Sequence, residues 1–335
     1  MRRTRHGGRQ QVRLLAYLLM LFAASGALDA STGWGQRKGA ARIGVLTDAW
    51  GPTPAVVGLR DGLQALGFRE GEDFDIGVRF TQGDVNALPQ AARGLVAAGP
   101  DIIFATTTSA ARAAKQATSV KPIVFAEVVG DPVKLGLVKT FARPGGNVTG
   151  VSSLAIELTL KRLEMFKELV PGLKRLLLVY DPHDVDAVAG VEVHRDAARQ
   201  LGLQLLEKAP RTQEEVRELA ARIRRSDADG VVAAPSGPSL NIPGSVLEMA
   251  QRVPTMFIGA YWVDQGGLAS YGPDFYDSGR QASRLVAKIL RGDKPENIPV
   301  EVNSRIELVV NLKTARALGL QPGQALLQRA DRLIQ

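Results

Sequence analysis

One succession of strands and helices runs twice along this chain, with an offset of about 130 residues. In the first run, short stretches rich in branched apolar residues indicate strands, and stretches of helical periodicity lie between them. The connections are too long for hairpins, so we expect right-handed crossovers between parallel strands. The predicted strands are 42–46, 74–80, 101–106, 122–127 and 148–152, and the predicted helices are 54–66, 86–98, 109–118 and 132–142.

Four elements of the first run recur in the same order in the second. One example is a glycine that ends a helix just before a strand, in Leu66-Gly67-Phe68 and again in Leu201-Gly202-Leu203. A single pair of this kind could arise by chance, but four in order indicate two lobes of similar topology. The matched pairs are 42–46 with 174–180, 66–68 with 201–203, 101–104 with 229–232, and 121–126 with 253–258.

The segment after residue 268 repeats nothing and is predicted to cross back and complete both lobes. It contains a predicted helix at 275–291, further strands and a helical tail. Several crossings would form a hinge that permits closure about a cleft. We therefore expect an α/β fold of two Rossmann-like, doubly wound lobes joined by a multi-strand hinge. Lobe 1 is predicted at 41–152 plus about 272–302, and lobe 2 at 153–271 plus about 303–335.

The first 27 residues have the order of a secretory signal. Five arginines precede an apolar run at 14–24, and the small residues Ser25-Gly26-Ala27 follow it. An uncleaved anchor is the alternative, but the run is shorter than the roughly 20 residues that span a membrane. We expect a signal peptide at 1–27, a flexible leader at 28–40, and export to the periplasm.

Charge and cysteine content narrow the classes of partner. Removing residues 1–27 takes away five Arg and no acid, so the net charge falls from +8 to +3 (8 − 5). The folded part then lacks the basic excess of a nucleic-acid-binding protein. The sequence has no Cys, which excludes disulfides, thiol chemistry and a lipid-modified N-terminal cysteine. We expect a free periplasmic monomer that binds a small molecule and no nucleic acid.

The sequence offers little for catalysis. It contains no GxSxG, GxGxxG, GxxxxGK or HExxH pattern, and outside the leader its histidines are His183 and His194. The group Asp181, His183, Asp184 and Asp186 could be interpreted as metal ligands. A polar loop that begins a helix explains it better, because ligand geometry does not follow from spacing alone. We therefore predict no catalytic residue, no metal and no cofactor.

Ligands of open α/β sheets bind beyond the carboxyl ends of the strands, and polar residues stand at several predicted ends. The hydroxyls and free N–H groups at Thr107, Thr108 and Ser109 suit an anion, although a simple helix cap is an equal alternative. Asp131 and the pair Ser152-Ser153 have the same two interpretations, and capping alone explains them adequately.

Aromatic residues gather at the same strand ends. Such rings suit stacking on a planar or apolar ligand, whereas core aromatics would be scattered through the helices. Packing of the hinge is the alternative explanation. The residues concerned are Trp50, Tyr180, Tyr261, Trp262, Tyr271 and Tyr276.

Six short motifs give the chain a family resemblance. The longest is Ala142-Arg143-Pro144-Gly145-Gly146-Asn147-Val148-Thr149-Gly150, and the others lie at 63–68, 130–132, 167–172, 270–273 and 311–315. The chain resembles the bacterial ABC-transporter substrate-binding proteins related to tryptophan- and tyrosine-uptake receptors. The resemblance implies the type I periplasmic-binding-protein fold and delivery of a ligand to an inner-membrane ABC permease. A sensor that feeds a receptor or kinase, or an enzyme on the same scaffold, is the alternative.

The resemblance also implies a ligand site between the lobes. Thr107 to Ser109, Asp131 and Ser152-Ser153 would line one wall, with Tyr180 and Tyr261 on the other. An amino-acid-like ligand would place its carboxylate at Thr107 to Ser109 and its ammonium group at Asp131 or Asp181. The full set of predicted ligand-binding residues is Trp50, Thr107, Thr108, Ser109, Asp131, Ser152, Ser153, Tyr180, Asp181, Tyr261 and Tyr271.

The leader yields a direct prediction about the native N-terminus. The exported protein should begin between Leu28 and Lys38 and should be recovered in soluble periplasmic extract. Mass spectrometry of the purified native protein measures this directly. An intact Met1 on membrane-bound protein would contradict the prediction.

Overall fold

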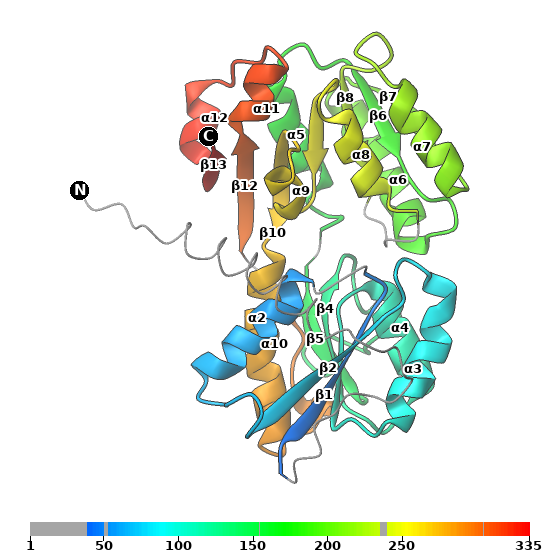
Figure 1. Cartoon of the computed structure of the whole chain (residues 1–335), viewed down its shortest axis with the longest axis vertical. Helices are drawn as coiled ribbons and strands as arrows, with labels where there is room; N and C mark the ends of the chain where they lie inside the picture. The colour runs from blue at the N-terminus through cyan, green and yellow to red at the C-terminus, as the bar shows by residue number, and fades with distance from the viewer. Residues whose placement is uncertain (1–38, 50–52, 154, 235–239, 304) are drawn as a thin grey trace, which may run out of the picture. The chain divides into compact units, whose positions relative to one another are not determined.

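Two mostly parallel sheets form the framework of a computed structural model that describes residues 39–49, 53–153, 155–234, 240–303 and 305–335 (Figure 1). All the described residues belong to one compact unit. The α/β fold class predicted from the sequence is confirmed. No helix among the described residues is both long and apolar enough to span a membrane.

Sheet A has six strands in the order β11-β5-β4-β3-β1-β2, and every pair is parallel. We call this sheet with its helices lobe 1. Its strands are β1 (Ala41–Thr47), β2 (Phe74–Phe80), β3 (Ile102–Ala105), β4 (Ile123–Val128), β5 (Val148–Ser152) and β11 (Glu301–Val302). Its helices are α2 (Pro54–Ala65), α3 (Leu88–Ala97), α4 (Thr108–Ala117) and α10 (Phe275–Leu290), with short 3-10 turns η1 (Val85–Ala87) and η2 (Pro295–Asn297).

Sheet B has seven strands in the order β13-β12-β10-β9-β8-β6-β7, and only β10 and β12 pair antiparallel. This sheet with its helices is lobe 2. Its strands are β6 (Arg175–Val179), β7 (Gln204–Lys208), β8 (Gly230–Ala233), β9 (Thr255–Phe257), β10 (Ala269–Pro273), β12 (Ile306–Asn311) and β13 (Arg332–Ile334). Its helices are α5 (Thr159–Leu169), α6 (Val185–Gln200), α7 (Gln213–Arg222), α8 (Ile242–Met249), α9 (Tyr261–Asp264), α11 (Leu312–Ala317) and α12 (Gln324–Arg329).

Alternation of side chains along the strands builds a core on each face of sheet A. Ile43 and Val45 of β1 join the core under α2 and α10, whereas Leu46 joins the core under α3 and α4. In β3, Phe104 faces the first core and Ile103 the second. Because both faces are buried, helices must cover both, as Figure 1 shows. Sheet B has two cores for the same reason.

Helices α2 and α10 approach each other closely because small residues line their contact. A Cβ built on Gly58 would lie 2.0 Å from the Tyr276 carbonyl oxygen, and one on Gly279 would lie 2.0 Å from the Ala55 carbonyl oxygen. At Gly62 the nearest atom would be the Ser283 hydroxyl at 2.3 Å. The contact joins residues more than 200 positions apart, so it fixes the returning chain on lobe 1.

Three segments connect the two sheets, after β5, between β10 and α10, and between β11 and β12. Asn303 connects all three. Its N–H donates to the Ser152 carbonyl oxygen at 2.8 Å, and its side-chain amide donates to the Asp274 carbonyl oxygen at 2.7 Å. Arg162, which is 2% exposed, donates to the carbonyl oxygens of Tyr271 and Ala155. Hydrogen bonds to main-chain oxygens therefore help to hold the crossings. The lobe boundaries set out above stay a prediction.

The glycine-rich motif at 143–150 shapes the start of β5. The Asn147 side-chain amide donates to the carbonyl oxygens of Thr118 and Lys121, at 3.0 and 2.7 Å. Gly145 has a φ of +71°, which favours glycine, and a Cβ on Gly150 would lie 2.3 Å from the Phe125 carbonyl oxygen. This motif is structural rather than part of a binding site.

Two elements differ from the sequence prediction. The helix predicted at 132–142 is wrong, because residues 132–136 form turns, with Gly136 at a φ of +69°. The helical tail is only partly right. It contains α11 and α12 but ends in strand β13, which pairs in parallel with β12 and so extends sheet B.

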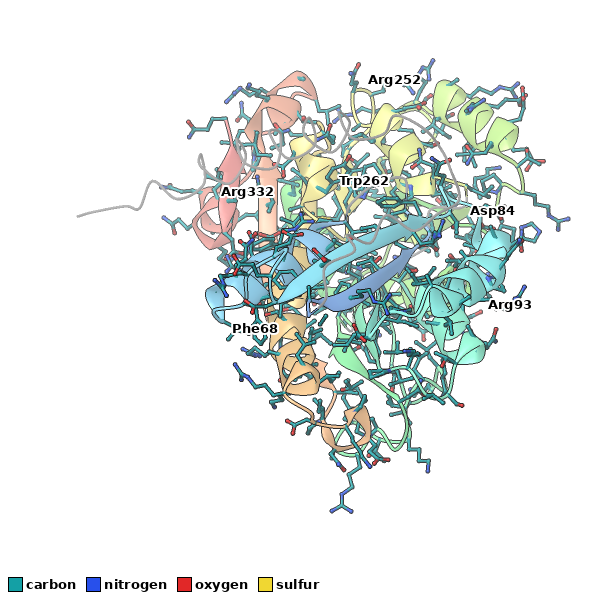
Figure 2. All side chains as sticks on the ribbon, turned by 60° about the horizontal axis from the view of Figure 1, so that its bottom comes forward. Phe68, Asp84, Arg93, Arg252, Trp262 and Arg332 are labelled. Carbon is teal, nitrogen blue, oxygen red and sulfur yellow. The ribbon has the colours of Figure 1, made fainter. Side chains whose placement is uncertain are left out.

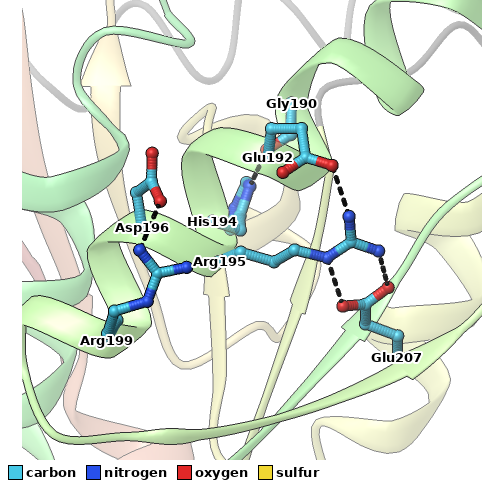
Figure 3. A network of polar contacts seen from close by, with 7 residues as sticks. All are labelled: Gly190, Glu192, His194, Arg195, Asp196, Arg199 and Glu207. Atoms are coloured by element: carbon cyan, nitrogen blue, oxygen red, sulfur yellow. Dashed lines mark hydrogen bonds and ion pairs between the residues drawn. The ribbon is translucent and has the colours of Figure 1, made fainter.

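Helix α6 is held by both buried and surface polar contacts (Figure 3). His194, which is 1% exposed, contacts the Gly190 carbonyl oxygen through Nδ1 at 2.7 Å. Burial lowers the pKa of His194 to about 4, so the ring is neutral at pH 7. On the outer face, Arg195 binds the Glu207 carboxylate in a bidentate manner at 2.8 and 2.7 Å. These contacts fix the helix that begins at the candidate site described below.

The glycine contact predicts a difference between two identical substitutions. Gly58→Ala should lower the free energy of unfolding by about 1–3 kcal/mol, because its methyl group would collide with the backbone of α10. Gly94→Ala should raise it by up to about 1 kcal/mol, because Gly94 lies within α3 with no atom near its Cβ position. Urea unfolding of both variants measures the difference. Equal effects at the two positions would contradict the packing argument.

Candidate ligand-binding site

Buried polar groups without partners are concentrated at the carboxyl edge of sheet A. Among the described residues, seven buried side-chain oxygens make no hydrogen bond, and six of them lie at this edge. Such a group costs about 1–3 kcal/mol, so this concentration indicates a place adapted to something other than stability. The six atoms belong to Asp48, Thr53, Thr81, Thr106 and Thr108.

Two neighbouring hydroxyls at the start of α4 have different roles. Thr107 is the N-cap, with extended backbone, and its hydroxyl accepts from the Ala110 N–H at 3.1 Å. Thr108 follows it at 4% exposure, and its hydroxyl makes no hydrogen bond among the described residues. Capping therefore uses the Thr107 hydroxyl, whereas that of Thr108 lies beside the Asp186 carboxyl.

The start of α2 is capped from a distance. Thr53 occupies the N-cap position but makes no side-chain capping bond. Instead the Glu127 carboxyl accepts from the Ala55 N–H at 3.2 Å. Glu127 has a φ of +58° and lies where the β4–β5 register shifts, a strained geometry that turns it toward α2. Burial raises the pKa of Glu127 to about 8, despite the Ala55 N–H, which favours the ionised form.

A cavity of about 990 Å³ lies between loops of the two lobes. Figure 2 labels Asp84 from lobe 1 and Trp262 from lobe 2, and both residues line it. Lobe 1 contributes Gln82, Gly83, Asp84, Val85, Asn86, Thr108, Ser109 and Arg112. Lobe 2 contributes Asp181, His183, Asp184, Asp186, Arg211, Gln213, Arg217, Leu240, Asn241, Tyr261 and Trp262.

Carboxyl groups from both lobes meet beside the start of α4. Burial raises the pKa of Asp186, which lines the cavity, to about 6; the Thr108 hydroxyl and Arg112 oppose this rise, while Asp184 and Asp48 add to it. Burial also raises the pKa of Asp48 to about 6, and Asp184 adds to the rise. The Thr107 hydroxyl lies near enough to Asp48 to oppose the rise, although no described group completes a hydrogen bond with that carboxyl. Negative potential is therefore concentrated here.

Cationic and aromatic groups line other parts of the cavity. Exposed guanidinium groups come from Arg112, Arg211 and Arg217, and Arg112 is close enough to Asp186 to lower the pKa of that carboxyl. Tyr261 is 49% exposed and contacts Trp262 edge to face, with ring centroids 5.1 Å apart. Trp262 stacks in turn on Phe257 at 6.1 Å. The cavity thus combines acidic, basic and aromatic surfaces, the chemistry that a zwitterionic aromatic molecule requires.

Four of the residues predicted for the site line this cavity, namely Thr108, Ser109, Asp181 and Tyr261. Asp181 is 4% exposed and accepts from the His183 N–H at 2.8 Å. Thr107 lies beside the cavity as the cap of α4. Trp50 lies outside the described residues.

The structure places the other predicted residues outside this cavity, in contacts within a single lobe. The Asp131 carboxylate accepts from the Val133 N–H within a turn, at 2.8 Å. The Ser152 hydroxyl donates to the Gly130 carbonyl oxygen and that of Ser153 to the Val128 carbonyl oxygen, so both are satisfied inside lobe 1. Tyr180 and Tyr271 pack against a core of lobe 2, and Tyr276 donates to Asp61 of α2.

Sequence reasoning missed several lining or neighbouring residues. Asp48 follows β1 directly and the loop at 82–86 follows β2 closely, so the strand-end argument applied to Thr107 to Ser109 would have found both. Arg112 stands four residues after Thr108, which places it on the same face of α4. Nothing local marks Arg211 or Arg217, because only the approach of the two lobes brings them to the cavity.

Asp184 acts as a helix cap. Its carboxylate accepts from the N–H groups of Asp186 and Ala187, at 2.9 and 3.2 Å. Within the described ranges, no three His, Asp or Glu side chains are arranged to hold a metal ion. The acidic residues at 181–186 therefore begin α6 and line the cavity.

Comparison with known proteins places this chain in a family. The family model "ABC transporter substrate binding protein" matches residues 47–334. The chain belongs to this family.

Individual relatives agree with the family match. The chain is 30% identical over 271 residues to a tyrosine-binding protein of Clostridioides difficile, covering 79% of this chain and 76% of that protein. A crystal structure of a conserved domain protein from Vibrio cholerae is 31% identical, with a TM-score of 0.79 over 88% of this chain and 99% of that one. A Streptococcus pneumonia protein crystallised with L-Trp is 27% identical, with a TM-score of 0.76 over 88% and 100%.

The orphaned carboxyl predicts a stabilising substitution at the site. Burial raises the pKa of Asp48 from its ordinary value of 3.8 to about 6 in the folded state, so ionisation destabilises the fold as the pH rises through this interval. Asp48→Asn should therefore raise the free energy of unfolding at about pH 8 by roughly 1–3 kcal/mol, and by much less near pH 4. Urea unfolding at both pH values measures the gain.

Asp84→Asn is the matched control for this substitution. The Asp84 carboxylate lines the same cavity but accepts from the N–H groups of Asn86 and Ala87, at 2.9 and 3.2 Å. Asparagine can make the same cap, so this variant should differ from the wild type by less than about 0.5 kcal/mol at both pH values. A stability gain for Asp48→Asn that does not depend on pH would show that its charge is not the cause.

Proposed function

We propose that this protein is the solute receptor of an ABC import system, which captures an aromatic amino acid between its lobes and delivers it to an inner-membrane permease. The observation that carries the proposal is the cavity of about 990 Å³, to which both lobes contribute charged and aromatic residues. Its size lies at the upper end of the range for small-molecule sites. A ligand that touches both walls favours the closed arrangement and so provides a form for the permease to recognise.

The relatives support the choice of ligand class. One is a tyrosine-binding protein and another was crystallised with L-Trp. The Tyr261–Trp262 pair offers an exposed ring and a stacked ring to a planar side chain. Charged groups of both signs in the same cavity suit a zwitterion.

The place of action follows from the same proposal. Receptors of import systems capture their ligands outside the inner membrane, and the N-terminal 27 residues have the order of a cleaved secretory signal. With no cysteine for a lipid anchor, the protein would diffuse freely in the periplasm. The hydrogen-bonded crossings at Asn303 would be the hinge on which the lobes close.

A thermal-unfolding screen with L-tryptophan, L-tyrosine, other amino acids, sugars and nucleosides tests the ligand class. An aromatic amino acid at about 100 times its Kd should add about 2.7 kcal/mol to the free energy of unfolding. Tyr261→Ala should weaken its binding by about tenfold in calorimetry, because an exposed ring over the cavity is lost.

Tyr276→Phe is the control for the ring substitution. Its hydroxyl donates to Asp61 at 2.8 Å within the α2–α10 contact, away from the cavity, so its loss should leave affinity unchanged. Stabilisation by sugars alone would overturn the ligand class. Equal binding by the wild type and Tyr261→Ala would show that the aromatic part of the ligand lies elsewhere.

A further inference from the structure

We propose that the amino group of the ligand, rather than its carboxylate, binds beside the start of α4, between Asp186 of lobe 2 and Thr108 of lobe 1. This inference rests on the proposed function and reverses the orientation predicted from the sequence, in which the carboxylate met Thr107 to Ser109. Asp186 and Thr108 both line the cavity, at 8% and 4% exposure.

The charges around this point favour a cation. The start of a helix alone would attract an anion. Here two carboxyl groups from different lobes, Asp48 and Asp186, are already near it; Asp48 disfavours ionisation of Asp186, and Asp184 of lobe 2 disfavours ionisation of Asp48. A ligand carboxylate would add a further negative charge, whereas an ammonium group would compensate the existing ones.

Hydrogen bonding points to the same group. The Thr108 hydroxyl is buried and lines the cavity; it lies near enough to Asp186 to lower the pKa of that carboxyl but completes no hydrogen bond with a described residue. An ammonium group carries only donors and would find an acceptor in this hydroxyl and another in the Asp186 carboxylate. Residues from both lobes would then hold one group, so its binding would favour closure.

The remaining charged groups near this point determine how binding depends on pH. Asp184 begins α6 and Asp48 follows β1, and both raise the pKa of Asp186. Arg112 of α4 lowers the pKa of Asp186, and Asp48 raises the pKa of Glu127 in β4. Asp181 contacts His183 in the loop before α6. Because the pKa of Asp186 is raised to about 6, an ammonium ligand has to displace a proton from Asp186 below that pH.

The orientation also assigns the ligand carboxylate to the basic part of the cavity. Arg112 lies one helical turn after Thr108 on the same face of α4, and Arg211 and Arg217 line the cavity from lobe 2. A guanidinium group can bind a carboxylate through two parallel hydrogen bonds. The amino group would then face the carboxyl groups of the cavity, and the ligand carboxylate would face the guanidinium groups.

Calorimetry with three probes tests the site: L-tryptophan, tryptamine, which lacks the carboxylate, and 3-(indol-3-yl)propionate, which lacks the amino group. The same three forms of tyrosine make a second series. The deaminated acid should bind the wild type at least about 100-fold more weakly than the amino acid. Asp186→Asn should weaken the amino acid about 10- to 100-fold and leave the deaminated acid nearly unchanged.

The pH dependence of binding distinguishes an effect of the Asp186 charge from an effect of the shape of its side chain. Between about pH 8 and pH 5, wild-type affinity for the amino acid and the amine should fall about tenfold, and in Asp186→Asn this fall should be reduced. Asp196→Asn, which changes an exposed carboxyl of the same helix outside the cavity, should behave as the wild type. Urea unfolding shows whether each variant is folded, and Thr108→Val provides a second, neutral perturbation that should weaken only the amino compounds.

The outcomes distinguish this inference from the proposed function. If the amino acid binds but the deaminated acid binds equally well to the wild type, the amino-group site is overturned and the receptor function stands. If Asp186→Asn weakens both compounds equally, the residue shapes the cavity and does not recognise the amino group. If neither amino acid nor its amine binds the wild type, the ligand class and this site both fail.

Discussion

Burial of parallel strands on both faces is the constraint on which the rest of this structure depends. Neither face of sheet A is exposed to water, because Ile43 and Val45 enter one core and Leu46 enters the other. Helices must therefore cover both faces of each sheet. The loops that connect strands to helices then gather at the carboxyl edge of the sheet, and the candidate site is built from those loops.

The carboxyl edge of sheet A contains groups that lower the free energy of unfolding. Asp48 is fully buried with no hydrogen bond among the described residues, and Glu127 has a backbone geometry that non-glycine residues rarely adopt. Each feature opposes stability and is maintained by the well-packed sheet below it. The α2–α10 glycine contact is part of that support, because α2 begins where Glu127 accepts from Ala55. The well-packed core thus supports the strained groups at the edge of the same sheet.

The crossings between the lobes have a different character from the cores. Asn303 and Arg162 hold them through hydrogen bonds to main-chain oxygens, which are directional and involve few groups. The returning helix α10 fixes one end of these crossings on lobe 1, and β12 with β13 fixes the other in sheet B.

The sequence by itself determined the fold class, the repetition of the two lobes, and the bounds of strands such as Phe74–Phe80 and Val148–Ser152. These predictions follow from the local spacing of apolar and polar residues, a signal to which every residue of a strand or helix contributes. It also singled out Thr108, Ser109, Asp181 and Tyr261, which line the cavity, because each stands at a strand end or helix start. It could not tell these residues from Ser152, Asp131 or Tyr180, which occupy similar positions but find partners within their own lobe. Only the tertiary structure decided that Asp186 approaches Thr108 from the other lobe, because that proximity depends on how two separately folded sheets meet.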